Sequence, residues 1–188
     1  MLGDGHISPT QIIITLNNNE ITYIKYVKFL IKKLFNATPH LCKTHGKNTT
    51  RSNVSDIYVG SVDMVKYFLN MGLVSNKVRF QVDIPKWIKI NKKFVVGFLR
   101  GFFDTDGSIY KLRFGVQISY TNASIPLLRS TKTLLETLGY HPSKMSRNSK
   151  TSAFRIYLTK RIELCNFLNK IISANQKHIQ RAKSFGII

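Results

Sequence analysis

An internal repeat of about one hundred residues is the feature that most constrains the fold of this chain. The matching segments are residues 4–7 with 106–109, 14–18 with 118–122, 57–59 with 156–158, and 68–70 with 167–169. Each copy of the last segment is followed by a lysine, Lys77 or Lys177. Because the matches keep one order with small drifts in spacing, they predict a duplicated structural unit.

The stretch 98–107 combines an apolar helix pattern with acids at its end. Gly97 and Gly101 lie inside this predicted helix, where each glycine costs about 1 kcal/mol relative to alanine. Asp104 and Asp106 stand at the C-terminal end, where the helix dipole disfavours negative charge. The pattern therefore predicts helices that pack closely along a glycine stripe and deliver acids to a shared metal site.

With these residues the chain resembles the LAGLIDADG homing endonucleases that carry two motifs in one polypeptide. Leu99–Gly107 aligns with the nine-residue motif that names the family, and Leu2–Gly5 aligns with its last part. Met1 falls inside the first motif, so we expect most of the first motif helix to be missing. The resemblance implies an α+β fold of two pseudo-symmetric αββαββα units, whose antiparallel sheets form a DNA-binding saddle.

The expected division of the chain is a first unit at residues 1–74, a connector at 75–92 and a second unit at 93–188. Alternation of apolar and polar residues predicts the strands. Gln11, Ile13, Thr15 and Asn17 are expected on one face of a strand, as are Lys111, Arg113, Gln117 and Ser119 in a single strand of the second unit. A helix is expected at about 20–35, burying Ile24, Val27, Leu30, Ile31 and Leu34.

The charge balance favours a polyanionic partner. The chain has 29 Lys and Arg against 9 Asp and Glu, for a net charge of +20, and such an excess is typical of proteins that bind nucleic acid. No signal-peptide pattern and no apolar run of membrane-spanning length is present, so we expect the cytoplasm or an organelle matrix and no membrane partner. Cys42 and Cys165 are too few for a disulfide framework or a zinc site.

The polar strand faces and the basic hairpins are predicted to bind double-stranded DNA, because their side chains suit phosphates and base edges. A simpler alternative is an antiparallel sheet with one hydrated face. The predicted DNA-binding residues are Gln11, Thr15, Lys43, Lys47, Arg51, Lys111, Arg113, Gln117, Ser119, Lys144, Arg147 and Lys150.

The family resemblance implies a catalytic role for Asp4 and Asp106, the last acids of the two motifs. They would bind two or more Mg²⁺ ions between them, with backbone carbonyls of Gly3 and Thr105 as further ligands, because Mg²⁺ prefers oxygen ligands. In the alternative, each aspartate caps a turn with the following glycine. Asp104 is expected instead to hold the helix end or to pair with a base.

The resemblance also places Lys77 and Lys177 near the scissile phosphate, where a lysine can polarise water or stabilise developing charge. The equally weighted alternative is that both are ordinary surface lysines. The five histidines show no paired metal-binding spacing.

The sequence therefore predicts a monomeric, site-specific homing endonuclease, encoded in an intron or derived from an intein. It would make a metal-dependent double-strand cut at a long asymmetric site, because two unlike halves need not read a palindrome. One alternative is an intron maturase of the same fold, which binds RNA and does not cut. Another is a DNA-binding regulator with degenerate acids.

Overall fold

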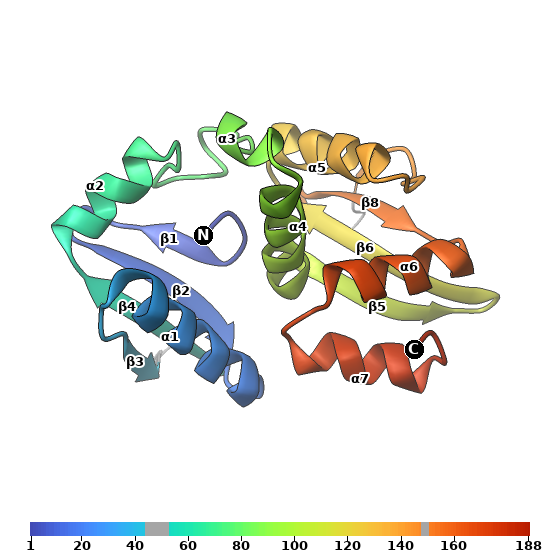
Figure 1. Ribbon diagram of the computed structural model, residues 1–188, viewed down its shortest axis with the longest axis horizontal. Helices are drawn as coiled ribbons and strands as arrows, with labels where there is room; N and C mark the ends of the chain where they lie inside the picture. The colour runs from blue at the N-terminus through green and yellow to red at the C-terminus, as the bar shows by residue number, and fades with distance from the viewer. Residues whose placement is uncertain (44–52, 148–150) are drawn as a thin grey trace. The chain divides into compact units, whose positions relative to one another are not determined.

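The computed structural model describes residues 1–43, 53–147 and 151–188. The chain divides into two compact units, Met1–Asn76 and Lys77–Ile188 (Figure 1). The described residues form seven helices and two antiparallel four-stranded sheets, which confirms the predicted α+β class. Among these residues, no helix has the length and apolar character needed to cross a bilayer.

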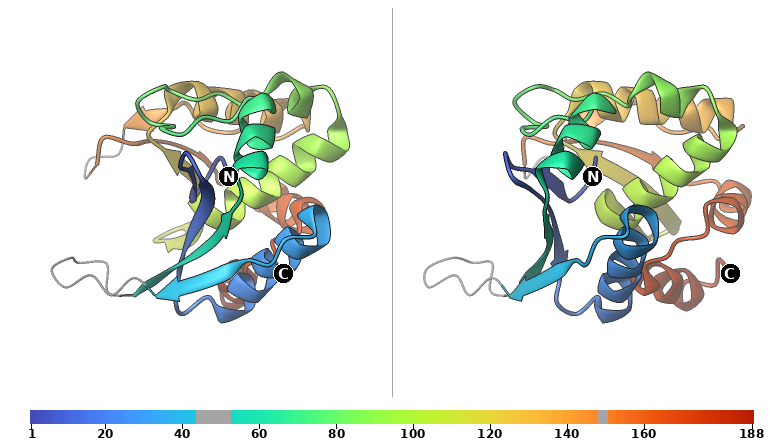
Figure 2. Two further views of the ribbon diagram at one scale, coloured as in Figure 1. Left: turned by 90° about the vertical axis from the view of Figure 1, so that its left-hand side faces the viewer. Right: turned by 60° about the vertical axis from the view of Figure 1, so that its left-hand side comes forward.

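The first unit holds a sheet with the strand order β1-β2-β4-β3. Its strands are β1 (Gly5–Ile7), β2 (Gln11–Asn17), β3 (His40–Lys43) and β4 (Val54–Gly60), and its helices are α1 (Ile21–Phe35) and α2 (Val62–Asn70). Both helices lie on the same side of the sheet (Figure 2). The buried core consists of Ile7, Ile12, Leu16, Tyr23, Ile24, Val27, Ile31, Ile57, Val59 and Val65, among others.

The second unit repeats this order, with its sheet arranged β5-β6-β8-β7. Its strands are β5 (Gly107–Leu112), β6 (Gly115–Asn122), β7 (Ser146–Arg147) and β8 (Phe154–Leu158). Its helices are α3 (Lys86–Lys89), α4 (Lys92–Asp106), α5 (Ile125–Thr137), α6 (Arg161–Ile171) and α7 (Gln176–Ser184). Leu99, Phe103, Ile118, Tyr120 and Phe167 lie in its core, where the Tyr120 hydroxyl donates a 3.1 Å hydrogen bond to the Leu99 carbonyl.

The predicted single strand across residues 111–119 is wrong, because the chain reverses at Arg113 and Phe114 between β5 and β6. Gly115 follows the turn with a φ of +152°, a region that glycine enters without steric cost. The register pairs Lys111 with Val116 and Tyr110 with Gln117. Lys111 therefore belongs to the opposite face from Gln117, and Arg113 sits in the turn.

The predicted apolar stripe of α1 is wrong at its C-terminal end. Leu34 is 67% exposed, whereas Tyr23 near the start of the helix is buried. The next residue, Phe35, contacts α2 instead through the ring of Phe68, with ring centroids 5.4 Å apart. Successive residues of a helix point about 100° apart around its axis. Because Phe35 points towards α2, its neighbour Leu34 points away from the core.

The strand registers refine the repeat between the two units. Gly5 pairs with Ile14 in the first sheet, and Gly107 pairs with Tyr120 in the second. Ile14 is therefore equivalent to Tyr120, two residues beyond the partner that the sequence comparison assigned, because the second hairpin is longer.

Candidate nucleic-acid interface

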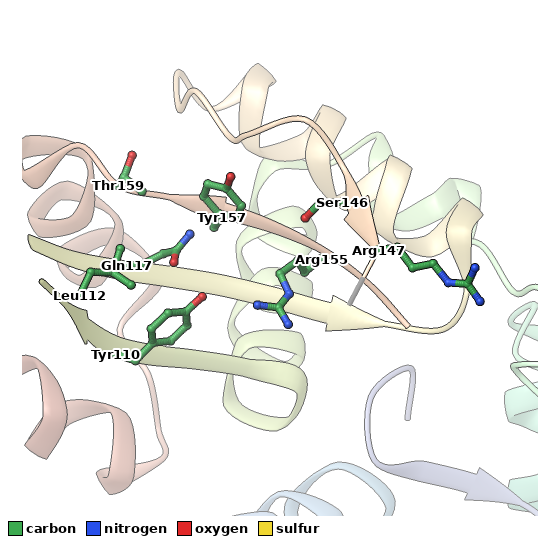
Figure 3. Close-up of a pocket in the computed structure, with 8 residues that line it drawn as sticks. All are labelled: Tyr110, Leu112, Gln117, Ser146, Arg147, Arg155, Tyr157 and Thr159. Carbon is green, nitrogen blue, oxygen red and sulfur yellow. The ribbon is translucent and has the colours of Figure 1, made fainter. Parts of the chain in front are cut away.

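The polar face of the second sheet contains a hollow of about 390 Å³ (Figure 3). Its lining comes from all four strands of the sheet and from the residue that follows β8. The lining residues are Tyr110, Leu112, Gln117, Ser146, Arg147, Arg155, Tyr157 and Thr159. The register places Tyr110, Gln117, Ser146 and Arg155 on one face, because Tyr110 pairs with Gln117 and Ser146 pairs with Arg155. Arg147 pairs instead with Phe154 and lines the hollow from the end of β7. Aromatic, guanidinium and amide groups are thus gathered on one surface.

Arg155 places a buried hydrogen-bond donor in this hollow. Its Nε atom is buried and has no hydrogen-bond partner among the described residues. Figure 3 shows its guanidinium on the same side of the sheet as the Tyr110 hydroxyl. A buried donor without an acceptor is destabilising, so an acceptor on a ligand would complete this site.

Two of the predicted DNA-binding residues, Gln117 and Arg147, line the hollow. Ser119 lies on the same sheet face and, like Gln117, is buried, and its hydroxyl is 3.0 Å from that of Ser108. Arg113 stacks over the ring of the exposed Phe114, at 5.0 Å from the centroid.

Other predicted DNA-binding residues lie elsewhere. Lys144 is exposed in the segment before β7, and Lys111 is exposed at the end of β5. Lys47, Arg51 and Lys150 lie outside the described residues, as does the side chain of Lys43 at the end of β3.

Sequence reasoning missed Tyr110, Arg155 and Tyr157. The repeat offered a signal for two of them, because Tyr157 matches Tyr58 and Arg155 is two residues earlier on the same strand face. Tyr110 was missed because residues 111–119 were read as one strand, which hid the hairpin that brings Tyr110 beside Gln117.

The polar face of the first sheet differs in chemistry. Thr15 and Asp56 are paired across β2 and β4, and the Thr15 hydroxyl donates a 2.6 Å hydrogen bond to Asp56 Oδ1. His40 stacks on Tyr58, with ring centroids 5.3 Å apart. Gln11 begins β2 and is half-buried. This face therefore presents a carboxylate where the second sheet presents an arginine.

The motif acids occupy comparable places in the two units. Asp106 ends α4 and is half-exposed, and its Oδ2 accepts a hydrogen bond of 3.4 Å from the Asn122 amide. Asp4 is exposed and directly precedes β1, and its carbonyl accepts a 3.3 Å bond from the Thr15 N–H. Each acid thus stands at the entry to the first strand of its sheet.

The oxygen donors at these places suit a hard divalent ion, which needs one or two carboxylates plus carbonyl or phosphate oxygens. Thr105 has its hydroxyl bonded back to the Gly101 carbonyl at 3.1 Å, and Gly3 directly precedes Asp4. The described residues contain no group of three or more His, Cys, Asp or Glu side chains that would hold a metal alone. A metal here would therefore need backbone or substrate oxygens.

Asp104 differs from Asp106 by being 2% exposed and fully engaged within its unit. Its Oδ1 accepts a 2.5 Å bond from the Ser173 hydroxyl, and its Oδ2 accepts a 3.1 Å bond from the Ala174 N–H. Burial raises the pKa of Asp104, while these bonds and the charge of Arg100 oppose the rise. Asp104 therefore bonds to the segment between α6 and α7.

The two predicted lysines have different surroundings. Lys177 is the second residue of α7, and its N–H donates to Asn175 Oδ1 at 3.1 Å. Lys77 lies in a turn, where its carbonyl accepts a 3.0 Å bond from the Val82 N–H. Both are half-buried.

His178 follows Lys177 and is completely buried against Phe103, with ring centroids 4.4 Å apart. Burial, together with the charges of Lys177 and Arg181, lowers the pKa of His178 from 6.5 to about 3. The backbone at Phe103 and Asp104 favours the protonated His178 ring, but these are the smallest contributions to its pKa. Neither ring nitrogen of His178 has a hydrogen-bond partner among the described residues.

Comparison with known proteins agrees with this architecture. Residues 93–172 match the model of the LAGLIDADG-like domain. The homing endonuclease I-DmoI in complex with DNA and Ca is similar in structure, with a TM-score of 0.62 and 17% identity over 93% of this chain and 82% of that chain. The N-terminal LAGLIDADG domain of DUF199/WhiA has a TM-score of 0.60 and 14% identity over 90% of this chain and 75% of that one.

A replication factor C small subunit from Methanocaldococcus jannaschii is 27% identical over 190 residues. The match covers 96% of this chain, which spans only 9% of that relative. The matched residues 93–172 include the motif Leu99–Gly107, so this part of the chain is a LAGLIDADG-like domain. The two-unit α+β fold of the chain is similar to the folds of I-DmoI and of the LAGLIDADG domain of DUF199/WhiA.

Proposed function

We propose that this chain is a site-specific endonuclease that binds double-stranded DNA on its two sheets and cuts it with the help of divalent metal ions. The observation that carries the proposal is the position of Asp106 at the junction of α4 and β5. The polar face of the adjoining sheet holds Arg155, whose buried Nε has no hydrogen-bond partner in the described part of the chain. A solved relative, I-DmoI, is described in complexes with DNA and Mn, Ca or Mg.

The sheet residues would bind and orient the duplex. Arg155 can donate to the O6 and N7 acceptors of a guanine, and Gln117 can make a bidentate pair with adenine. Arg147 at the exposed rim of the hollow suits a phosphate oxygen. The net charge of +20 would draw the duplex to the protein.

The acids would hold the metal ions. Asp4 and Asp106 would supply carboxylate oxygens, and Gly3 and Thr105 would supply backbone carbonyls. When bound, divalent ions stabilise the attacking and leaving oxygens of a phosphodiester. Lys177 would stabilise negative charge on the phosphate or polarise water, with the same role proposed for Lys77.

The unlike faces of the two sheets favour an asymmetric target read by one chain. Because the related segment occupies 9% of a much longer protein, we further propose that the domain is carried within an intron-containing or intein-containing host gene.

Binding without cleavage is the second candidate. The fold matches DUF199/WhiA about as well as it matches I-DmoI, and a fold alone does not assign chemistry. Retention of Asp4 and Asp106 favours the nuclease over a DNA-binding regulator or an RNA maturase.

A library of random-sequence DNA duplexes separates these candidates. The full chain is incubated with the library and Mg²⁺, and the newly formed ends are captured and sequenced. The nuclease proposal predicts a recurrent asymmetric cut site that disappears when EDTA is added. Enrichment of bound duplexes without cut ends would support a regulator, and preference for RNA over the same DNA would support a maturase.

A further inference from the structure

The side chain of Asp104 joins two elements that carry candidate catalytic groups. Asp104 lies in the last turn of α4, two residues before Asp106. Its carboxylate accepts bonds from Ser173 and Ala174, which directly precede α7. Asp104 therefore connects the helix that ends in a metal-binding candidate to the helix that begins near Lys177.

Asn175 extends this connection to the backbone of Lys177. Its side-chain amide donates a 3.1 Å bond to the Asp104 carbonyl, and its Oδ1 caps α7 by accepting from the Lys177 N–H. The Ser173 hydroxyl also accepts a 3.1 Å bond from the Asn175 N–H. Asp104, Ser173 and Asn175 are all buried, so these bonds are shielded from competing water.

A strained residue precedes this network. Ile172 ends α6 with a φ of +45°, a left-handed conformation that is unusual for a β-branched side chain. Arg100, one turn before Asp104 on α4, donates a 2.8 Å bond to the Ile171 carbonyl. The α6–α7 connection is thus fixed to α4 at two successive turns, and its backbone is held in a strained form by the contacts around it.

We infer that Asp104 is a positioning residue, which sets the place of Lys177 relative to Asp106. This inference rests on the proposed nuclease function. Asp104 does not touch the metal or the DNA in this account. It acts through Ser173 and Asn175, which determine where α7 begins and hence where the lysine stands.

Glu163 provides a matched control within the same unit. It is also a buried acid that accepts a backbone N–H, in this case from His141 at 2.9 Å, and it also holds a connecting segment to a helix. Its bonds reach the segment after α5 and not α7. Glu163→Ala should therefore destabilise the unit as Asp104→Ala does, without displacing Lys177.

Hydrogen exchange on the full chain tests the positioning without DNA or metal. The Lys177 N–H should exchange about tenfold faster in Asp104→Ala than in the wild type, because loss of the network opens the start of α7. Glu163→Ala should leave that amide unchanged. Equal protection of Lys177 in the wild type and Asp104→Ala would overturn the inference. If Asp104→Ala does not fold, Ser173→Ala, which removes one hydroxyl, gives the same comparison.

Single-turnover cleavage of a selected site in Mg²⁺ tests the link to function. Asp104→Ala should cut about 10- to 100-fold more slowly with unchanged DNA affinity, because small displacements of catalytic groups cost rate. The double variant Asp104→Ala/Lys177→Ala should be no slower than Lys177→Ala alone, since one residue acts through the other. Additive losses would refute the positioning role. A wild-type chain that never cuts would instead refute the nuclease function on which it rests.

Discussion

Asp56 and Arg155 occupy equivalent positions on the polar faces of the two sheets. Asp56 pairs with Thr15 across β2 and β4, and Arg155 pairs with Thr121 across β6 and β8. The two halves of the repeat thus present opposite charges at one structural position. A carboxylate can accept a hydrogen bond from the amino group of cytosine, whereas an arginine donates to guanine.

Replacing Arg155 should therefore relax selectivity at one base pair. We expect Arg155→Ala to lose about 1–3 kcal/mol of discrimination against the wrong base, because a bidentate contact disappears. Affinity for a panel of duplexes with single substitutions measures the effect. A uniform loss across the panel would show that Arg155 contacts phosphate and does not read a base.

Asp56→Asn should change selectivity at a different base pair, in the half-site bound by the first unit. An amide both donates and accepts, so the variant should gain affinity for adenine at the position where the wild type prefers cytosine. The same panel of duplexes detects this change. Selectivity altered only at the Arg155 position would contradict the assignment of the two sheets to two half-sites.

Phosphate contacts should make binding depend strongly on salt. Each neutralised phosphate contributes about −0.9 to the slope of log affinity against log salt concentration. Arg147→Ala should reduce this slope by about 1 without changing base preference, because Arg147 lies at the rim of the hollow. The matched control is Lys132→Ala on α5, where the lysine already pairs with Glu136. Equal changes in both variants would refute a specific phosphate contact by Arg147.

The buried His178 should make stability fall as the pH is lowered. Its pKa of about 3 in the folded chain lies below its ordinary value of 6.5. As the pH is lowered, His178 is protonated in the unfolded chain before it is protonated in the folded chain. The free energy of unfolding is therefore not reduced by His178 above pH 6.5 and falls progressively below that pH. The expected loss is roughly 2 kcal/mol between pH 8 and pH 5.

His178→Phe should remove most of that pH dependence while keeping a ring against Phe103. Urea unfolding at the two pH values measures the difference. Asp83 and Glu163 have lowered pKa values and begin to contribute only below their ordinary values of 3.8 and 4.5. An equally steep loss in the variant would show that another group controls the acid sensitivity.

Gly107, the last residue of the second motif, and Gly97, two residues before that motif, should respond oppositely to alanine. A Cβ on Gly107 would lie 2.2 Å from Phe103 Cδ2 and 2.3 Å from the Phe103 carbonyl oxygen, so Gly107→Ala should destabilise the chain by about 1–3 kcal/mol. A Cβ on Gly97 meets open space, so Gly97→Ala should stabilise α4 by up to about 1 kcal/mol. Thermal unfolding compares the two. Destabilisation by Gly97→Ala would indicate that another segment packs on this glycine.

The sequence predicted the fold well where periodicity and the repeat agreed. The alternation at residues 11–17 predicted β2, and the motif predicted the helix that ends at Asp106. It failed at Arg113 and Phe114, because a two-residue turn without a strong turn signal interrupts an otherwise alternating run.

The site was harder to predict than the fold because its residues meet through strand register. Tyr110, Gln117 and Arg155 share a face only after β5, β6 and β8 are aligned. The role of Asp104 depends on Ser173, which is far away in sequence and shows no motif of its own. Local patterns carry no information about such pairings.

The central claim, that Asp106 serves metal-dependent cleavage, is tested most directly by comparing Asp106→Asn with the wild type on one selected duplex. We predict that the variant binds this duplex with near wild-type affinity and makes no double-strand cut in Mg²⁺, because the neutral amide lacks the negative charge with which a carboxylate binds a hard cation. Asp83→Asn, which alters an acid paired with Lys89, should cut normally. Cleavage by Asp106→Asn at the wild-type rate in Mg²⁺ would contradict the account.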